Sequence, residues 1–189
     1  MYFLHLVTII NQQYFPHYMP KSDSFFIRAT LEVDDAGTFQ QTPINLGSYV
    51  DALGMSVLRV HKIAVAWTAS DGTAADMDAN AAGDAGYQIT TQSQSSMVLL
   101  SDRSVVASGG ISARNPDASA NPPATVWEHD INPEQWTNGY LIAVEEMYLG
   151  GYGSTEWVAG SNLTVSCVLE CTVEKMSKDA ALALALSQQ

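Results

Sequence analysis

The sequence is poor in positive charge. Eight Lys and Arg side chains stand against twenty Asp and Glu side chains in 189 residues, which gives a formal net charge of −12. A protein with this charge repels the phosphates of nucleic acids and the headgroups of anionic lipids. No Lys or Arg occurs before Lys21. We therefore expect that this chain does not bind nucleic acid directly.

Cysteine is also scarce, because Cys167 and Cys171 are the only two in the chain. They lie four residues apart in the segment LTVSCVLECTV, and on an extended strand this spacing separates their Cα atoms by about 13 Å. A disulfide needs Cα atoms closer than about 7 Å. We therefore predict no intrachain disulfide, and we interpret both thiols as small core groups rather than as redox or metal-binding groups.

Long apolar runs are missing as well. The most apolar stretch near the N-terminus is MYFLHLVTII at residues 1–10, which is too short to span a bilayer. It has no Lys or Arg ahead of the apolar run and no cleavage site of small residues. We interpret it as an N-terminal strand or arm rather than as a signal peptide.

The usual signatures of catalysis are not found. No His-x-His pair occurs, although a metal-dependent cupin enzyme of jelly-roll fold would use one. No Gly-x-Ser-x-Gly and no reactive cysteine setting occurs either. The densest group of catalytic residue types is WEHD at residues 127–130, which we interpret as a solvated capping segment rather than an acid–base site. We predict no enzymatic activity and no cofactor, and a cupin-like enzyme is the least favoured alternative.

An acidic, low-complexity segment at residues 69–86 contains the only metal candidates. The spacing does not match an EF-hand loop, because Ala81 stands where glycine is required and Tyr87 stands where the bidentate glutamate belongs. We interpret the segment as a solvated loop, and a Ca²⁺ site remains its alternative. The carboxylates of that alternative site are Asp71, Asp76, Asp78 and Asp84.

The clearest positive signal is the alternation of residues 163–173. Six apolar side chains occupy the odd positions, and mostly polar side chains occupy the even positions. Because side chains alternate between faces along a strand, the segment is predicted to be a long strand with one apolar face. Burying that face would contribute roughly 9–18 kcal/mol before chain entropy is subtracted, and it needs a second layer to cover it.

Similar patterns predict about eight strands and therefore an all-β, antiparallel β-sandwich of jelly-roll type. Short helical elements are predicted at residues 47–54, at 131–136 with Asn132 as the N-cap, and after Ser177, which is the predicted N-cap of the tail helix. We expect one domain, divided into an N-terminal arm (1–24), the sandwich (25–175) and a C-terminal tail with a short helix (176–189). The predicted strands cover residues 24–33, 38–46, 56–68, 87–93, 96–100 with a continuation at 104–107, 125–128, 139–149 and 163–173.

The connections between these strands alternate in character. Long loops at 69–86 and 108–123 and a Gly-rich connection at 150–161 would lie at one end of a sandwich, and the short helices at the other. This layout, with its arm and tail, resembles the single jelly-roll capsid proteins of icosahedral viruses. The resemblance implies a structural protein of the virion shell that associates with copies of itself. The acidic balance further implies a second capsid protein or an internal membrane between shell and genome.

Two sets of exposed residues follow from these interpretations. A shell subunit would use the apolar residues of its arm and tail as interfaces. Aromatic residues in loops would instead serve as sugar-stacking platforms in the alternative function, a carbohydrate-binding β-sandwich module. The interface set is Tyr2, Phe3, Tyr14, Phe15, Tyr18, Leu182, Leu184 and Leu186, and the sugar-stacking set is Trp136, Tyr152 and Trp157.

Overall fold

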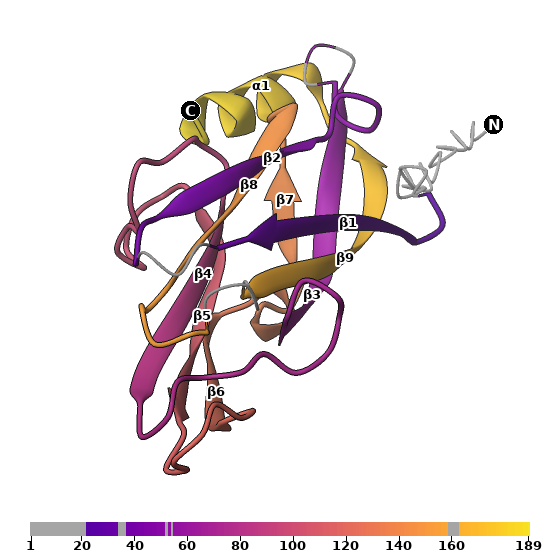
Figure 1. Cartoon of the computed structure of the whole chain (residues 1–189). Coiled ribbons are helices and arrows are strands. Elements are labelled where there is room, and N and C mark those ends of the chain that lie inside the picture. The colour runs from indigo at the N-terminus through magenta and orange to yellow at the C-terminus, as the bar shows by residue number, and fades with distance from the viewer. Residues whose placement is uncertain (1–21, 34–36, 52, 54, 159–162) are drawn as a thin grey trace, which may run out of the picture.

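A computed structural model describes residues 22–33, 37–51, 53, 55–158 and 163–189. It contains two antiparallel sheets (Figure 1), which confirms the prediction of an all-β sandwich. The four-stranded sheet has the order β1 (Phe25–Glu32), β9 (Thr164–Lys175), β3 (Ser56–Thr68) and β7 (Tyr140–Ile142). The five-stranded sheet has the order β2 (Gln40–Asn45), β8 (Glu146–Gly153), β4 (Ala82–Thr90), β5 (Val105–Arg114) and β6 (Ala124–Ile131).

The pairing of the strands is that of a jelly roll. β1 pairs with β9, β2 with β8, β3 with β7, and β4 with β5, so the chain is one long hairpin rolled into two sheets. β6 is an additional strand, because it pairs with β5 at the edge of the five-stranded sheet. The predicted jelly-roll type is therefore confirmed, and β6 contains the short strand predicted at 125–128.

β9 is the central strand that its alternating pattern predicted. It pairs with β1 on one side and with β3 over nearly its whole length on the other. Its apolar face points into the space between the sheets and meets the inner residues of β4 and β8. The buried residues of β9 and of the residue before it are Leu163, Thr164, Val165, Cys167, Leu169, Cys171 and Thr172.

Cys167 and Cys171 are both free and buried on this inner face, as predicted. Burial raises the pKa of each thiol to about 12, because a thiolate would be far from water. The glutamate next to Cys171, Glu170, adds a smaller effect in the same direction. Both groups therefore stay protonated at neutral pH and fill space in the core.

Neither thiol of the native protein is expected to react with 5,5′-dithiobis(2-nitrobenzoate) at pH 8, whereas both react once the chain is unfolded in urea. The same pKa shift makes the native state lose stability as the pH rises from about 8.5 toward 12. In that range the thiols of the unfolded chain ionise while the buried thiols of Cys167 and Cys171 remain neutral. Rapid labelling of the native protein would contradict this account.

Two segments rich in small residues turn out to be strands rather than loops. β4 begins at Ala82, inside the segment predicted to be a loop up to residue 86, and β5 continues to Arg114, well into the loop predicted for 108–123. Both strands lie in the middle of the five-stranded sheet, where Ala85 and Ala113 are buried. Partners on either side satisfy the backbone, so the low strand propensity of Gly and Ala is overridden.

The prediction of a single strand at 139–149 is also wrong, because these residues belong to two strands in different sheets. The chain leaves the four-stranded sheet after β7 and enters the five-stranded sheet at β8, so residues 143–145 cross between the layers. β8 then extends to Gly153, four residues beyond the predicted end. A strand was also predicted at 96–100, where the structure has no strand.

The predicted separation of loops and helices holds in part. The loops after β3, β5 and β8 do meet at one end, because Met77 bridges to both Asn121 and Trp157. At the opposite end lies α1 (Lys178–Ser187), which Ser177 caps as predicted. The 3-10 helix η1 (Pro133–Gln135) was expected at the α1 end, but it packs beside the middle of β3, where Asn132 Nδ2 donates to Ile63 O at 2.8 Å.

The segment predicted to be helical at 47–54 forms only a hydrogen-bonded turn within its described part, with Tyr49 and Val50 both donating to Leu46 O. No helix in the described part of the chain is long and apolar enough to cross a membrane.

Candidate interaction surfaces

The end of the sandwich that carries α1, here called the helical end, gathers distant parts of the chain. The connection after β2 meets the one before β8, because Leu46 N donates to Glu145 O at 2.8 Å. The connection before β3 meets the end of β9, because Met176 N donates to Met55 O at 2.9 Å. Figure 1 shows α1 lying across the strand ends here.

α1 is fastened at its C-terminal end by Gln188, which is 3% exposed. Its side-chain oxygen accepts from Ala143 N at 2.9 Å, and its side-chain nitrogen donates to Leu141 O at 2.7 Å. Its main-chain oxygen accepts from Thr91 Oγ1 at 3.0 Å. Gln188 therefore joins the helix to the chain between β7 and β8 and to the end of β4.

Gln188→Ala is expected to lower the free energy of unfolding by about 1–3 kcal/mol, because it leaves the buried amide of Ala143 and the carbonyl of Leu141 without their partner. Gln189→Ala is the matched control, because Gln189 is exposed and contributes only its main-chain oxygen, to Arg103. Urea unfolding of both variants measures the difference. Equal midpoints would show that Gln188 does not fasten the helix.

The helix buries alanines and exposes leucines. Ala181 and Ala185 pack against Val57 and Ala143 beneath them. Of the leucines predicted as interface residues, Leu184 packs partly against this same small cluster, whereas Leu182 is 41% and Leu186 is 62% exposed.

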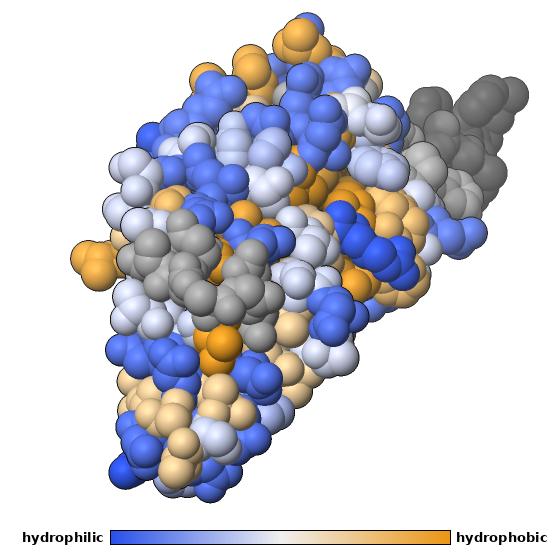
Figure 2. Space-filling model, viewed as in Figure 1, coloured by the Kyte–Doolittle hydropathy of each residue, from blue (hydrophilic) through white to orange (hydrophobic). Residues whose placement is uncertain are grey.

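The neighbouring connection between β2 and β3 also exposes large apolar side chains, among them Leu53 at 70% and Met55. We call the exposed residues Leu53, Met55, Leu182 and Leu186 the apolar end surface. Figure 2 shows hydrophobic residues among the hydrophilic ones at this end of the molecule. The predicted interface residues Tyr2, Phe3, Tyr14, Phe15 and Tyr18 lie outside the described residues.

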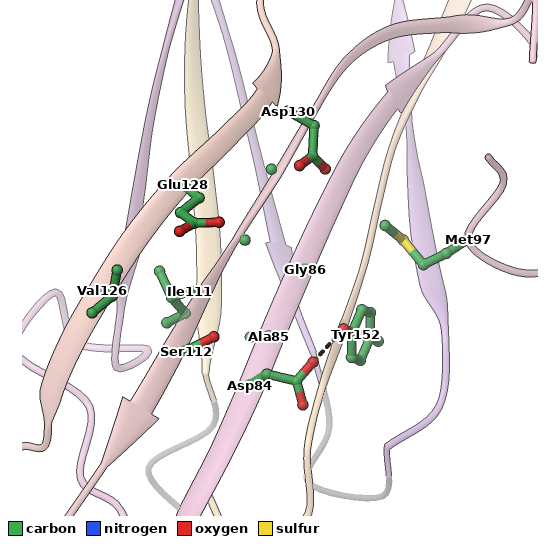
Figure 3. Close-up of a pocket in the computed structure, with 12 residues that line it drawn as sticks. Asp84, Ala85, Gly86, Met97, Ile111, Ser112, Val126, Glu128, Asp130 and Tyr152 are labelled. Carbon is green, nitrogen blue, oxygen red and sulfur yellow. Dashed lines mark hydrogen bonds between the residues drawn. The ribbon is translucent and has the colours of Figure 1, made fainter. Parts of the chain in front are cut away.

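A second candidate surface is a hollow of about 230 Å³ in the outer face of the five-stranded sheet (Figure 3). Gly86 and Gly110 lie opposite each other on β4 and β5 and form its floor. A Cβ on Gly86 would come within 2.6 Å of the Tyr152 ring, and one on Gly110 within 2.7 Å of Ala85 O. A side chain at either position would therefore clash with an atom that is already there, so the floor requires glycine at both positions.

The rim of the hollow is acidic and carries one aromatic ring. Asp84, Glu128 and Asp130 supply carboxylates, and Tyr152 supplies the ring. The Tyr152 hydroxyl donates to the Asp84 carboxylate, as Figure 3 shows. Partial burial, together with this acceptor and its charge, raises the pKa of Tyr152 to about 12. The Ser108 hydroxyl similarly donates to Asp130 Oδ2 at 2.8 Å. The hollow thus offers carboxylate acceptors that suit hydroxyl donors.

The three aromatic residues of the sugar-stacking set do not come together. Trp157 was expected on an exposed loop, but it is 4% exposed and its indole nitrogen donates to Asp84 O at 3.3 Å. It therefore has no open face for a sugar ring. Trp136 is 48% exposed but lies beside η1 and β3, away from the hollow. Only Tyr152 lines the hollow.

The four aspartates of the alternative Ca²⁺ site bond to different parts of the chain. Asp71 accepts from the amide and hydroxyl of Thr73, and these bonds lower the pKa of the Asp71 carboxyl. Asp84 lies in β4 and accepts from Tyr152. The backbones of Asp76 and Asp78 bond to the connection after β8. Among the described residues, no three His, Cys, Asp or Glu side chains gather as a metal ion would require.

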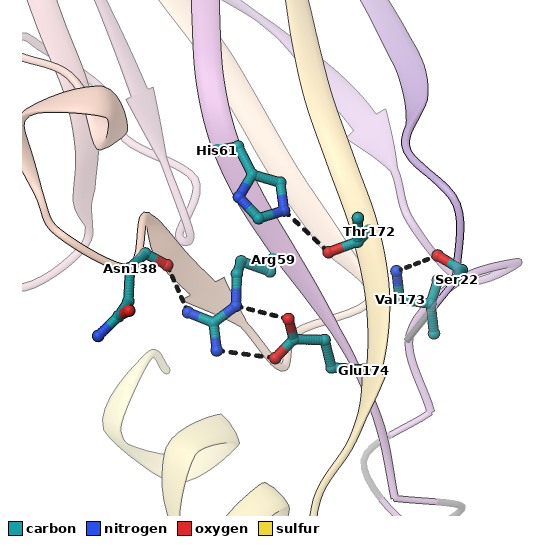
Figure 4. A network of polar contacts seen from close by, with 7 residues as sticks. All are labelled: Ser22, Arg59, His61, Asn138, Thr172, Val173 and Glu174. Atoms are coloured by element: carbon teal, nitrogen blue, oxygen red, sulfur yellow. Dashed lines mark hydrogen bonds and ion pairs between the residues drawn. The ribbon is translucent and has the colours of Figure 1, made fainter. Parts of the chain in front are cut away.

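The outer face of the four-stranded sheet carries a network of polar contacts between its strands (Figure 4). Arg59 on β3 forms a two-pronged ion pair with Glu174 on β9, with both N–O distances at 2.7 Å. A third guanidinium nitrogen donates to Asn138 O. His61 Nε2 lies 2.9 Å from Thr172 Oγ1. These contacts tie β3 to β9 and to the chain before β7, so His61 is a structural residue here.

Sequence reasoning missed the hollow and the role of Gln188. The glycines of the floor were interpreted as loop residues, although Glu128 and Asp130, two apart on β6, indicated a polar face. Gln188 near the end of the chain carries no local signal, because its partners are about 45 and 97 residues away. Only the folded chain brings them together.

Comparison with known protein families gives no match for this chain, and comparison with curated proteins finds none that is similar in sequence. The class that the structure itself defines is an antiparallel β-sandwich of jelly-roll type.

Proposed function

We propose that this chain is a self-assembling shell subunit, a single jelly-roll capsid protein of a virion, without catalytic activity. The observation that carries the proposal is the apolar end surface on a jelly-roll sandwich. A cluster of exposed large apolar side chains rimmed by polar residues is typical of protein–protein contacts. Here such side chains come from α1 and from the connection before β3, and Met176 N, two residues ahead of α1, donates to Met55 O in that connection.

The charge of the chain shapes how copies would associate. Each copy carries −12, so copies repel one another over a range that salt shortens to about 8 Å at physiological ionic strength. Apolar contacts at the end surface must outweigh this repulsion. We therefore expect assembly to become more favourable as the salt concentration rises. The same charge argues for a second capsid protein or an internal membrane, rather than this chain, next to a genome.

Analytical ultracentrifugation and electron microscopy of the full chain test the proposal. Rings, capsomers or closed particles that grow with protein and salt concentration are the expected result. A monomer that persists at high protein and salt concentration would overturn it.

The second candidate function is carbohydrate binding in the hollow of the five-stranded sheet. It is favoured by one observation, the meeting of Tyr152 with three carboxylates over a glycine floor. Carboxylates accept hydrogen bonds from sugar hydroxyls, and an aromatic ring stacks on the apolar face of a sugar. A glycan array tests it, with Glu128→Gln as the variant because Glu128 is exposed. Binding that Glu128→Gln abolishes, by a protein that stays monomeric, would favour this function over shell assembly.

A further inference from the structure

The turn before β7 holds a chemically reactive dipeptide beside the polar network of the four-stranded sheet. Asn138 and Gly139 form the only Asn–Gly pair in the sequence. Gly139 N donates to Trp136 O at 3.1 Å, and Arg59 donates to Asn138 O. Asn138 is exposed, and Figure 4 shows its side chain pointing away from the network. Its side-chain amide is therefore open to water.

An Asn–Gly pair can lose the side-chain amide of its asparagine without an enzyme. The main-chain nitrogen of the glycine gives up its proton and attacks the side-chain carbon Cγ of the asparagine. A five-membered imide forms, and the amide nitrogen leaves with that proton as ammonia. Glycine favours this step, because no Cβ shields the attacking nitrogen. Water then opens the imide to give aspartate or isoaspartate.

Two hydrogen bonds of the turn act on this reaction in opposite directions. When Gly139 N loses its proton, negative charge develops on Asn138 O, where the Arg59 guanidinium lies ready to stabilise it. The bond from Gly139 N to Trp136 O opposes the reaction, because it must open before the nitrogen can attack. Opening one hydrogen bond of this kind slows the reaction by no more than about tenfold.

We propose that Asn138 is a site of spontaneous deamidation and that isoaspartate is its main product. The Arg59 guanidinium polarises the Asn138 main-chain carbonyl of the imide, so water adds to that carbon. The carbon becomes a carboxylate that stays paired with Arg59. The main chain then runs through the former side chain and is one carbon longer. This modification does not depend on either of the proposed functions.

The longer main chain does not fit the space that the turn occupies. Gly139 lies so close to β3 that an added Cβ would come within 2.3 Å of Val60 O. Isoaspartate at position 138 therefore shifts Gly139 and loosens the pairing of β7 with β3. We expect it to lower the urea midpoint of unfolding. Aspartate leaves the path of the main chain unchanged, so it should not have this effect.

Peptide mapping by mass spectrometry tests the proposal after the full chain is incubated at mildly alkaline pH, native and in urea. Asn80 and Asn121 are internal controls, because Ala81 hinders the attack with its Cβ and Pro122 has no N–H. We expect Asn138 to react in both states, in the native chain no more than about tenfold more slowly. Labelling by an isoaspartate-specific methyltransferase should show mainly isoaspartate. Asn138 unmodified in the native chain but modified in urea, or Asn80 modified equally fast, would overturn the proposal.

Two variants separate the modification from its effect on stability. Asn138→Gln keeps an amide, but its longer side chain would have to form a larger ring, so this variant should age without modification and without loss of stability. Asn138→Asp imitates the aspartate product and should keep the urea midpoint of the fresh protein. The aged protein with Asn138 should show a lower midpoint than both. An unchanged midpoint in extensively modified protein would contradict the loosening of β7.

Discussion

Replacing Leu182 and Leu186 together by glutamate is expected to abolish shell assembly while leaving the fold intact. About half of each leucine is exposed in the single chain, so covering both at an interface would contribute roughly 1.5–3 kcal/mol. Losing this contribution weakens each contact about 10- to 100-fold, and the two new charges weaken it further. Glutamate is a good helix former, so α1 should persist. Sedimentation velocity measures assembly and circular dichroism measures folding.

The matched control is Leu99→Glu with Leu100→Glu. These leucines are 79% and 50% exposed on the connection between β4 and β5, outside the apolar end surface. Because the control changes the net charge by the same amount, it separates a local contact from general repulsion. Normal assembly of the variant at Leu182 and Leu186, or equal loss in the control, would show that the apolar end surface is not the interface.

Gly139→Ala is expected to be the most destabilising small substitution among those considered. Gly139 has φ +64°, and an added Cβ would come within 2.3 Å of Val60 O, which is a backbone atom and cannot easily move. The left-handed backbone costs about 1–2 kcal/mol for a residue with a Cβ. The clash adds about 1–3 kcal/mol, and it lies where β7 joins β3. Denaturant unfolding should show a loss of about 2–5 kcal/mol.

Gly72→Ala separates these two causes. Gly72 also has a positive φ, +87°, but nothing lies within 4 Å of an added Cβ. This variant should therefore lose only the backbone contribution of about 1–2 kcal/mol. If the two variants lose the same stability, the close approach of Gly139 to β3 is not what holds β7 in place.

Predictions that depend on neighbouring residues hold, whereas predictions that depend on contacts between distant segments of the chain fail. The pattern of residues 163–173 predicted β9, because alternation is a property of neighbouring residues and survives in any sandwich. The caps of η1 and α1, Asn132 and Ser177, were likewise predicted, because a cap bonds within its own turn. In contrast, the Gly- and Ala-rich ends of β4 and β5 were assigned to loops, since only their flanking strands make them strands.

The candidate sites show the same contrast between local signals, which the sequence reveals, and contacts between distant residues, which it does not. Leu182 and Leu186 were singled out because an apolar tail stands out in any sequence, and both are exposed. The hollow was not predicted, because Gly86 and Gly110 meet only through the register of β4 with β5. The meeting of Trp67 and Trp157 was not predicted either, because they lie 90 residues apart in the sequence and Trp157 had been placed on an exposed loop.

By itself the sequence determined the class of fold, the acidic character of the surface and the burial of both thiols, because these depend on composition and on patterns within one segment. Only the tertiary structure decided that residues 139–149 divide between two sheets and that β6 pairs with β5 at the edge of one of them. It also decided where the hollow lies. The physical reason is that pairing between distant strands satisfies backbone groups and selects which side chains meet, and neither effect is encoded in neighbouring residues.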